Sequence, residues 1–595
     1  MKTHAINCAR LVAASLLLGA APAPKQPNIV ILLADDWGFT DVGAFGGEVA
    51  TPAIDALAMA GVRFSNFHVA GSCAPTRAML QTGISNHRAG LGNMPETIPP
   101  EHRGKPGYDM ILSDNVVTMA QLLRDGGYRT YLTGKWHLGS TPDKLPTARG
   151  YDHAFSLAHA GADNFADRPI EGLNDQADWT EDGKSAALPK DFYSSRFIVD
   201  TMIRYIDQGR ASGKPFFASV NFQANHTPVQ APDAYIARYA NRYASGWSIL
   251  RRERAANAAA IGIVPPKPAM AVMGTTKDWA TLSDAERTRR VRAMAAYAGM
   301  AEAMDEQVGR LVAHLKASGE YDNTIFVFLS DNGAEAFDAT TGWLGWLNAK
   351  AYYDLSTANM GRRNSFTAIG ASWASAAASP LRGYKFTASE GGLRVPLIMA
   401  WPGNRAIKPG RIAPRFTHVT DLAPTLLAAA GIAPTGPTYA GRPVERMAGA
   451  NLLPVLTGVR DSARRDDQPL GYELSGNAAL FKGDYKLVKN LAPTGDGSWK
   501  LYNIVRDPGE AIDLTQTDVQ RAHTMQADYS AFAKADQVLS MPPGYQSEQQ
   551  IIHNALHGQL IPKLWRLVPW LLIGLAVGIA FMIWRRTRQH RAERR

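Results

Sequence analysis

The sequence predicts an α/β protein with a large, doubly wound mixed sheet flanked by helices, then a smaller C-terminal antiparallel sub-domain and a transmembrane helix. The sheet is predicted from two apolar runs, residues 29–34 and 324–329, which are continuous rather than alternating. Continuous runs are typical of strands that are covered on both faces. Residues 216–222 and 395–400 have the same pattern. Helical segments separate these runs, so we expect ligands outside the carboxyl ends of the strands.

The clearest helix is predicted over residues 284–317. Ser283 and Glu286 form a capping box before it, apolar side chains recur along it at helical spacing, and Gly319 follows it as a stop signal. A shorter helix is predicted over residues 116–125. Strands that alternate with such helices indicate that the two faces of the sheet are covered.

The pattern changes after about residue 460. Residues 479–488 and 499–503 resemble hairpin strands, and Arg506-Asp-Pro-Gly-Glu510 resembles a turn. We therefore assign residues 461–520 to a small antiparallel sub-domain. The polar residues 521–566 are predicted to be a stalk.

The N-terminal residues 1–23 are predicted to be a signal peptide. Lys2 and Arg10 form a basic region, residues 11–20 are apolar but too few to span a bilayer, and small residues follow. The alternative is a buried N-terminal helix. A secretory signal would place the large domain outside the cytoplasmic membrane.

The other end of the chain has the features of a membrane anchor. Residues 567–584 form a run without charge, close to the minimum length for a bilayer-spanning helix. Trp565, Trp570 and Trp584 stand near its ends, and residues 585–595 are a basic tail that the positive-inside rule places in the cytoplasm. The alternative is a buried core helix. We expect a single-pass protein of the cell membrane with a periplasmic or other extracytoplasmic catalytic domain.

Composition and charge limit the function classes. The hydrophobic fraction of 46% and the charged fraction of 19% are ordinary for a globular protein. The net charge is +10, but residues 563–595 carry +7 of it and residues 1–24 carry +2, which leaves +1 for the body. The basic character belongs to the anchor, so no nucleic-acid partner is expected.

The mature chain is expected to contain a single cysteine. Cys8 lies in the signal peptide, which leaves Cys73. A lone cysteine cannot form an intramolecular disulfide, and a free thiol is a liability in an oxidising compartment. Its presence indicates a specific role or a chemical modification.

Two acidic clusters follow two of the predicted strands. Asp35 and Asp36 come after the first strand, and Asp331 and Asn332 come after the strand at 324–329. All four offer oxygen ligands, which Ca²⁺ and Mg²⁺ prefer, whereas zinc would be expected to recruit His or Cys. Such residues at a single strand end are more often part of a turn or a helix cap. The two clusters together predict a divalent-cation site.

The segment Gly71-Ser-Cys-Ala-Pro-Thr-Arg77 is the most specific motif. It fits the C-x-P-x-R core of the formylglycine-dependent sulfatases of the alkaline phosphatase superfamily, and residues 63–67 and 80–83 resemble that family too. The resemblance runs from about Pro27 to Leu514 and is nearest to the bacterial arylsulfatases, with residues 25–460 as the catalytic domain. It implies that a formylglycine-generating or equivalent maturation enzyme converts Cys73. Thr76 stands where serine is usual, and it retains a small hydroxyl.

The resemblance also assigns the remaining site residues. Gly134-Lys-Trp-His-Leu-Gly139 matches the segment with a sulfate-binding lysine and a catalytic histidine, which are Lys135 and His137 here. Asn225-His-Thr-Pro228 matches the second histidine, His226, and Arg382-Gly-Tyr-Lys385 matches the second lysine, Lys385. The metal ligands implied are Asp35, Asp36, Cys73, Asp331 and Asn332.

The family resemblance implies a mechanism for a sulfate monoester. The cation, Arg77 and the two lysines neutralise the sulfate, and one hydroxyl of the aldehyde hydrate at position 73 attacks sulfur. His226 protonates the leaving oxygen. His137 takes a proton from the second hydroxyl as sulfate leaves, so no second attack on sulfur is required.

Two other functions remain open. A phosphonate monoester or phosphodiester hydrolase of the same superfamily could use a formylglycine, although the second metal pair of those enzymes tends to be Asp-His rather than Asp331-Asn332. A non-catalytic carbohydrate-binding relative is the second alternative. The identity of the physiological sulfate ester depends on the loops at 160–190 and 335–380, whose conformation the sequence does not predict.

Overall fold

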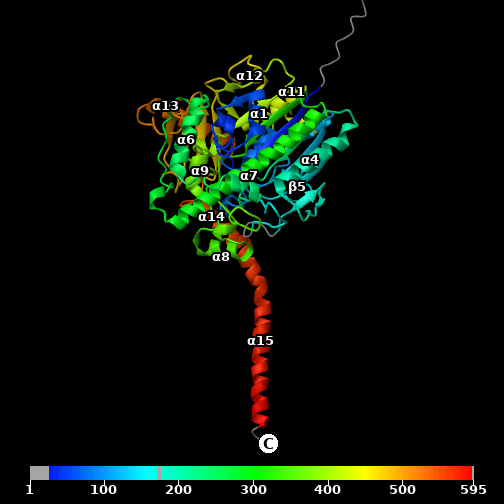
Figure 1. Cartoon of the computed structure of the whole chain (residues 1–595), viewed down its shortest axis with the longest axis vertical. Helices are drawn as coiled ribbons and strands as arrows, with labels where there is room; N and C mark the ends of the chain where they lie inside the picture. The colour runs from blue at the N-terminus through cyan, green and yellow to red at the C-terminus, as the bar shows by residue number, and fades with distance from the viewer. Residues whose placement is uncertain (1–25, 171–175, 593–595) are drawn as a thin grey trace, which may run out of the picture.

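The computed structural model describes residues 26–170 and 176–592. The predicted signal peptide lies outside the described residues, so its assignment stays a prediction. The described chain forms a rounded body with one long helix, α15 (Ile561–Ala592), projecting from it (Figure 1).

A ten-stranded mixed sheet forms the centre of the body. Its order is β11-β2-β10-β9-β1-β8-β4-β5-β6-β7. The strands β9, β1, β8, β4 and β5 are mutually parallel, whereas β10 runs antiparallel to both neighbours. The bounds are β1 Asn28–Ala34, β2 Val62–Phe64, β4 Arg129–Lys135, β5 His153–Leu157, β6 Trp179–Glu181, β7 Lys184–Ser185, β8 Phe216–Asn221, β9 Thr324–Ser330, β10 Leu397–Ala400 and β11 Arg411–Ala413. The prediction of a large mixed sheet is confirmed.

The strand β1 shows why its sequence does not alternate. Val30 and Leu32 face one hydrophobic core, and Ile29 and Ile31 face another on the opposite side of the sheet. Both sets are fully buried, so each position must be apolar.

Helices cover both faces. On one face α7 (Asp284–Ala317) packs against α1 (Pro52–Ala60), α4 (Ser194–Arg210) and α5 (Asp233–Arg238), while α2 (Cys73–Thr82), α3 (Met119–Asp125) and α11 (Leu422–Ala429) pack together on the other. The predicted capping box of α7 is present. The helix α3 begins later than predicted because Thr118 and Gln121 form its capping box. The remaining helices of the body are α6 Trp247–Ala260, α8 Gly342–Tyr352, α9 Gly370–Ala377, α10 Glu390–Leu393 and α12 Leu453–Leu456.

A four-stranded antiparallel sheet forms the predicted sub-domain. Its strands are β15 Leu470–Leu474, β16 Asn477–Lys482, β17 Tyr485–Lys489 and β18 Lys500–Asn503. Two small strand pairings complete the fold, β3 (Phe67–His68) with β12 (Thr417–His418) and β13 (Thr438–Tyr439) with β14 (Arg442–Pro443).

The structure differs from the predicted stalk at 521–566. The helix α13 (Val519–Ala535) packs on the small sheet, where its Ala522 and Met525 join Leu480, Leu487 and Leu501 in one cluster. Two apolar side chains one turn apart are enough to hold an otherwise polar helix on a sheet, which composition alone did not indicate.

The next residues also lie on the body rather than extending from it. Tyr108 accepts a hydrogen bond from the backbone N–H of Leu539 (2.8 Å), and Tyr545 donates one to the carbonyl of Thr97 (2.7 Å). The helix α14 (Ser547–Ala555) follows, and a π-helical turn (Leu556–Leu560) joins it to α15. The predicted stalk therefore stays on the body as far as α14, and α15 leads away from it (Figure 1).

A buried ionic network fastens the small sheet to the large domain. Lys486 on β17 lies 2.9 Å from Glu390 and 2.9 Å from Glu510, and His68 on β3 lies 3.0 Å from Glu390. All four side chains are buried. Removing one partner leaves an uncompensated charge in a medium that solvates it poorly.

Lys486→Met is therefore expected to lower the free energy of unfolding by about 3–5 kcal/mol. The measurement is the urea midpoint of the full chain in detergent. Lys500→Met on the same sheet is the control, because Lys500 is 39% exposed and its ion pairs are solvent-screened. Equal midpoints for the two variants would contradict this role of the network.

The helix α15 contains a 22-residue candidate membrane span, Val568–Gln589, which is apolar up to Trp584, ends in the basic tail and is not buried against the body. Among the described residues it is the one helix that is long and apolar enough to cross a membrane. It overlaps the predicted span at 567–584.

Candidate active site

The two acidic clusters meet at the carboxyl edge of the sheet. Parallel pairing of β1 with β9 places Ala34 beside Ser330, so the residues that follow both strands leave the sheet together. The backbone N–H of Asp36 lies 3.3 Å from Asp331, and the amide of Asn332 donates to Asp36 (2.6 Å). All of these side chains are fully buried.

Cys73 enters this cluster from the first residue of α2. Its Sγ lies 3.3 Å from Asp35 Oδ1, and ligand atoms of Asp35, Asp36, Cys73 and Asp331 all lie within 4.8 Å of one another. Burial, together with the carboxylates of Asp331 and Asp35, raises the pKa of the Cys73 thiol well above its usual value. The Thr76 hydroxyl accepts a hydrogen bond from the N–H of Ala70 (2.9 Å), which holds the turn before α2.

Three buried cations surround the carboxylates. Arg77 Nε donates to Asp331 (2.9 Å) from α2, Lys135 Nζ lies 2.6 Å from Asp35 at the end of β4, and Lys385 Nζ lies 2.8 Å from Asp36. Burial alone lowers the pKa of Lys135, but the Asp35 carboxylate offsets this and holds the pKa above its usual value. The cations stay charged at neutral pH and can bind an anion.

Both predicted histidines lie at the rim of this cluster. His137 follows β4 with a φ of 58°, an unusual backbone for a non-glycine residue, and its Nε2 lies 3.7 Å from Glu96. His226 follows β8, and its Nε2 lies 3.9 Å from Asp36. Burial lowers the pKa of His137 to about 4, against the opposing effect of Glu96. Burial, with Lys135 and Lys385 nearby, lowers the pKa of His226 to about 3. Both imidazoles are neutral at pH 7.

The donor set fits a hard divalent cation. Asn332 Oδ1 is buried without a hydrogen-bond partner, while its amide nitrogen is occupied by Asp36. Burial and the neighbouring Asp35 raise the pKa of Asp331 to about 6 in spite of Arg77. An orphaned amide oxygen beside crowded carboxylates is the arrangement that Ca²⁺ or Mg²⁺ would stabilise.

A pocket beside Lys385 and Glu335 lies between this cluster and the C-terminal part of the chain. It is also lined by Tyr545, Glu548 and Ile551. The wall of this pocket therefore includes α14, which is joined to α15 by the π-helical turn.

Comparison with known proteins identifies the family. The sulfatase family model matches residues 27–432. The chain belongs to the sulfatase family. This sulfatase is 37% identical over 507 residues to an uncharacterised sulfatase of Schizosaccharomyces pombe, covering 83% of this chain and 90% of that protein. It is 36% identical over 466 residues to an arylsulfatase of Klebsiella aerogenes, covering 76% of this chain and 97% of that protein.

Solved structures agree on the fold of this sulfatase. The crystal structure of Ps i-CgsB aligns with a TM-score of 0.61 at 24% identity, covering 90% of this chain and 99% of that one. A structure solved with its substrate D-glucosamine-2-N,6-O-disulfate aligns with a TM-score of 0.57 at 20% identity, covering 86% and 98%. The predicted family is confirmed, and these identities speak for the fold alone.

The sequence analysis missed two acidic residues of the sulfatase site. Glu335 lies 2.9 Å from Lys385 and, with Asp36 and His226, forms a second group of side chains close enough to share one ion. Its position shortly after Asp331-Asn332 could have indicated it. Glu96, the partner of His137, lies in a loop without any motif and gave no signal.

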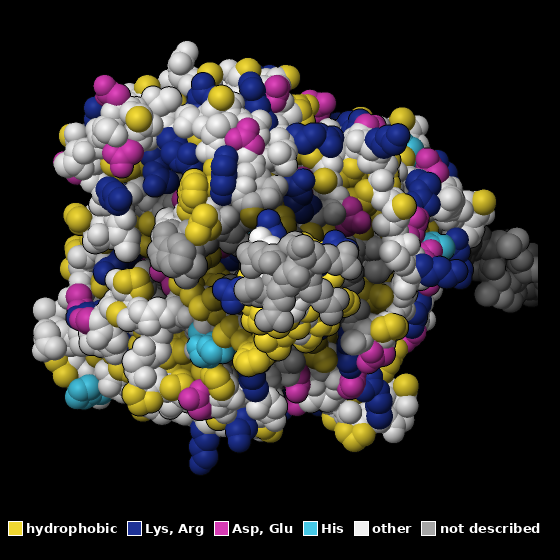
Figure 2. Space-filling view, turned by 90° about the horizontal axis from the view of Figure 1, so that it is seen from below, with side chains coloured by type: hydrophobic (Ala, Val, Ile, Leu, Met, Phe, Trp, Pro, Cys, Tyr) yellow, Lys and Arg dark blue, Asp and Glu magenta, His cyan; other side chains and the backbone are white. Residues whose placement is uncertain are grey.

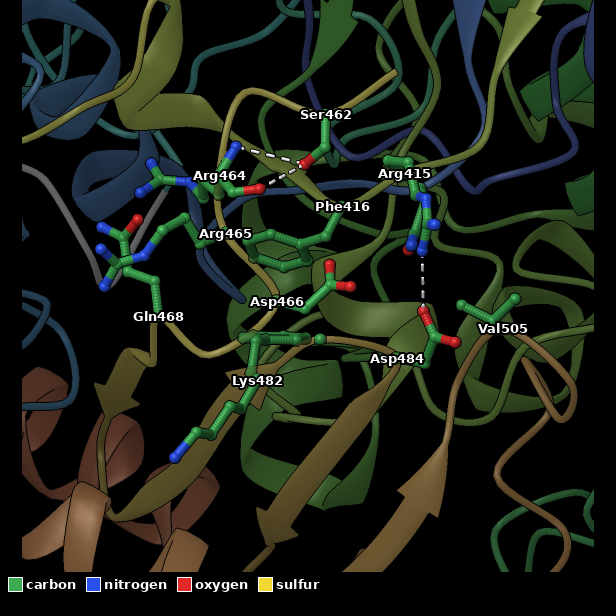
Figure 3. A pocket seen from close by; sticks show the side chains of 13 residues that line it. Arg415, Phe416, Ser462, Arg464, Arg465, Asp466, Gln468, Lys482, Asp484 and Val505 are labelled. Carbon is green, nitrogen blue, oxygen red and sulfur yellow. Dashed lines mark hydrogen bonds and ion pairs between the residues drawn. The ribbon is translucent and has the colours of Figure 1, made fainter. Parts of the chain in front are cut away.

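A second pocket lies between the large domain and the small sheet and is shown in Figure 3. Arg415 there is paired with Asp484 (3.3 Å), and Arg464 with Asp421. Because its cations already have carboxylate partners and the acidic cluster is elsewhere, we regard this pocket as part of the domain junction.

Proposed function

We propose that this chain is an arylsulfatase-like enzyme that hydrolyses sulfate monoesters with a formylglycine made from Cys73 and a divalent cation. The observation that carries the proposal is the position of Cys73, which lies among carboxylates and is encircled by three buried cations. The 36% identity to the arylsulfatase of Klebsiella aerogenes supports the substrate class. We further propose that α15 anchors the enzyme, with its catalytic domain outside the cytoplasmic membrane.

The residues around position 73 have different roles in binding the cation and the sulfate. Asp35, Asp36, Asp331 and Asn332 would hold Ca²⁺ or Mg²⁺, which supplies charge stabilisation at the sulfate oxygens. Lys135 and Lys385 neutralise the remaining sulfate charge, because both are buried and cationic. Arg77 positions the side chain of Asp331 and the carbonyl of Lys135 through its two hydrogen bonds.

The modified residue supplies a nucleophile with two hydroxyls on one carbon. The two histidines of the site would accept and donate the protons of the reaction. Neutral His137 can accept a proton, and Glu96 stabilises the charge that it then gains. His226 Nδ1 donates to the carbonyl of Thr227 (2.7 Å), which leaves the Nε2 lone pair free in the neutral ring. His226 can therefore protonate a leaving oxygen only after Nε2 has gained a proton, which a bound anionic substrate favours.

The test compares two esters. Full-length enzyme in detergent, made with its maturation enzyme, is expected to hydrolyse para-nitrophenyl sulfate far faster than bis(para-nitrophenyl) phosphate. The reverse preference would instead support the phosphodiesterase alternative. Activity on neither, with an intact fold, would support a non-catalytic carbohydrate-binding protein.

His226→Gln is expected to discriminate between leaving groups. A nitrophenolate leaves without a proton, so para-nitrophenyl sulfate hydrolysis should fall by less than about tenfold, whereas an alkyl sulfate, which needs a general acid, should lose about 10²–10⁴-fold in kcat/KM. His87→Gln is the control, because His87 is equally buried but pairs with Glu473 outside the acidic cluster. Equal losses for the two esters would remove the acid role from His226.

A further inference from the structure

The helix α8 presents an apolar surface to solvent. Trp346 and Leu347 are adjacent on this helix and are 47% and 49% exposed, and Tyr352, at its end and on another side of it, is 45% exposed. Single exposed apolar residues are ordinary on soluble proteins, but a Trp and a Leu exposed side by side are typical of surfaces that meet a partner or a membrane.

The position of α8 indicates what covers it. It lies at the end of the body from which α15 emerges, below α14 along the direction of the long helix (Figure 1). Seen from that end, hydrophobic side chains are interspersed with charged ones on the face of the body around the projecting helix (Figure 2). Trp565 and Trp570 at the start of the apolar segment are 69% and 72% exposed, as expected of side chains at a bilayer interface. A bilayer that receives α15 would therefore lie against α8.

The active site is continuous with this surface on the side of His226. The inner side of α8 packs Ala349 and Tyr353 against Ile170 and Phe366. Ile170 and His226 both lie against Gly161, since a Cβ placed there would be 2.9 Å from His226 Nδ1 and 3.1 Å from Ile170 Cδ1. A leaving group next to His226 would thus extend toward an apolar cluster that carries α8.

The pocket beside Lys385 is lined in part by the segment that leads into α15. Tyr545, Glu548 and Ile551 line this pocket. Asn554, one turn further along α14, donates to the carbonyls of Glu96 (3.0 Å) and Ile98 (3.1 Å), in the loop that carries the partner of His137. The segment that enters α15 therefore lines the pocket beside Lys385 and holds the loop that carries Glu96.

We propose that α8 is a second membrane contact, that the active-site mouth faces the bilayer, and that the substrate is a sulfate ester whose alcohol carries an apolar body resident in the membrane. This inference rests on the proposed sulfatase activity and on the anchoring role of α15. The sulfate enters the cationic cluster, while the apolar body stays in the lipid near α8.

The first test locates α8. Full-length protein carrying Leu347→Cys is labelled with an environment-sensitive fluorophore and placed in nanodiscs that contain a headgroup-level quenching lipid. Val459→Cys is the matched control, since Val459 is 78% exposed and follows α12 at the opposite end of the body in Figure 1, and Cys73 is too buried to react. We expect strong quenching at position 347 and little at 459. Equal quenching at the two positions would overturn the proposed membrane contact. An emission at position 347 that depends only on protein concentration would also overturn it, because it would indicate that a second copy of the chain covers α8.

The second test measures substrate preference in the same nanodiscs. Three esters are compared: para-nitrophenyl sulfate, a nitrophenyl sulfate with a long alkyl chain on the ring, and a sterol sulfate. The last two show whether the apolar body is an alkyl chain or a fused ring system. We expect at least one membrane-resident ester to exceed para-nitrophenyl sulfate in kcat/KM. A preference for neither would overturn the inference while leaving the proposed function intact, whereas no activity on any ester would reject the proposed function itself.

The double variant Trp346→Ser/Leu347→Ser connects the two tests. Losing two interfacial side chains should lower kcat/KM for the preferred membrane-resident ester by about tenfold or more, because both apolar side chains that would be buried in the lipid are removed. Hydrolysis of para-nitrophenyl sulfate should change by less than about twofold, since neither residue is part of the catalytic cluster. Val459→Ser should change neither ester. Equal losses for the soluble and the membrane-resident ester would contradict the proposal.

Discussion

Cys73→Ala is expected to lower kcat/KM for para-nitrophenyl sulfate by about 10⁴–10⁶-fold, the largest effect of any single change. Alanine lacks the thiol whose oxidation converts the Cβ of Cys73 into the aldehyde, and the cations around it would still bind sulfate. Binding of inorganic sulfate should therefore survive, which separates a missing nucleophile from a collapsed site. The measurement is steady-state kinetics on the full-length enzyme.

Cys73→Ser tests whether the second hydroxyl of the aldehyde hydrate is needed for turnover. A serine hydroxyl can attack sulfur once, but it has no second hydroxyl to expel the sulfate, so the enzyme should release about one alcohol per site and then stall. Thr76→Ser is the control, because it retains the hydroxyl that bonds to Ala70 and should leave activity nearly unchanged. Mass spectrometry of the peptide that contains residue 73 completes the test. An unmodified thiol throughout a fully active preparation would falsify the formylglycine mechanism.

Asp331→Ala is expected to have the second-largest effect. Asp331 is fully buried, lies beside Asp35 and Asp36, and pairs with Arg77. Its loss removes a cation ligand and leaves the Arg77 charge without its partner. We expect loss of the bound divalent cation and a fall of at least about 10³-fold in kcat/KM. Asp331→Asn, which retains one oxygen ligand, should fall less.

The readout that distinguishes this role is metal content, determined by elemental analysis of the purified protein. Asp305→Asn is the matched control, because Asp305 is another buried aspartate whose carboxylate accepts hydrogen bonds from Ala53 and Ile54, far from the cluster. This variant should retain both the cation and the activity. Full cation occupancy in Asp331→Ala would show that the carboxylate is not a ligand.

Much of the fold could be predicted because its signals are local. The apolar run of β1 has no alternation, since Val30 and Ile31 face different cores, and the capping box of α7 lies within four residues. The cation site was predicted for a similar reason. Asp35 and Asp331 each follow an apolar run, and strands that are parallel neighbours bring such residues to one edge.

The stalk was the part of the fold that the sequence did not predict. The helix α13 is mostly polar, and its attachment depends on Ala522 and Met525 meeting a sheet formed by residues far from it in sequence. The docking of α14 depends on Asn554 reaching the carbonyls of Glu96 and Ile98, more than 450 residues away in the chain. No periodicity or motif encodes a contact of that kind.

The sequence by itself determined the family, the strands that end in carboxylates, and the set of residues around Cys73, because each is a short pattern with its own chemistry. Tertiary structure alone decided which acids lie beside the predicted site residues, Glu335 beside Lys385 and Glu96 beside His137, and which segments line the pocket next to Lys385. Those features arise where loops from distant segments pack at one edge of the sheet, and such packing depends on shape in three dimensions rather than on any local pattern.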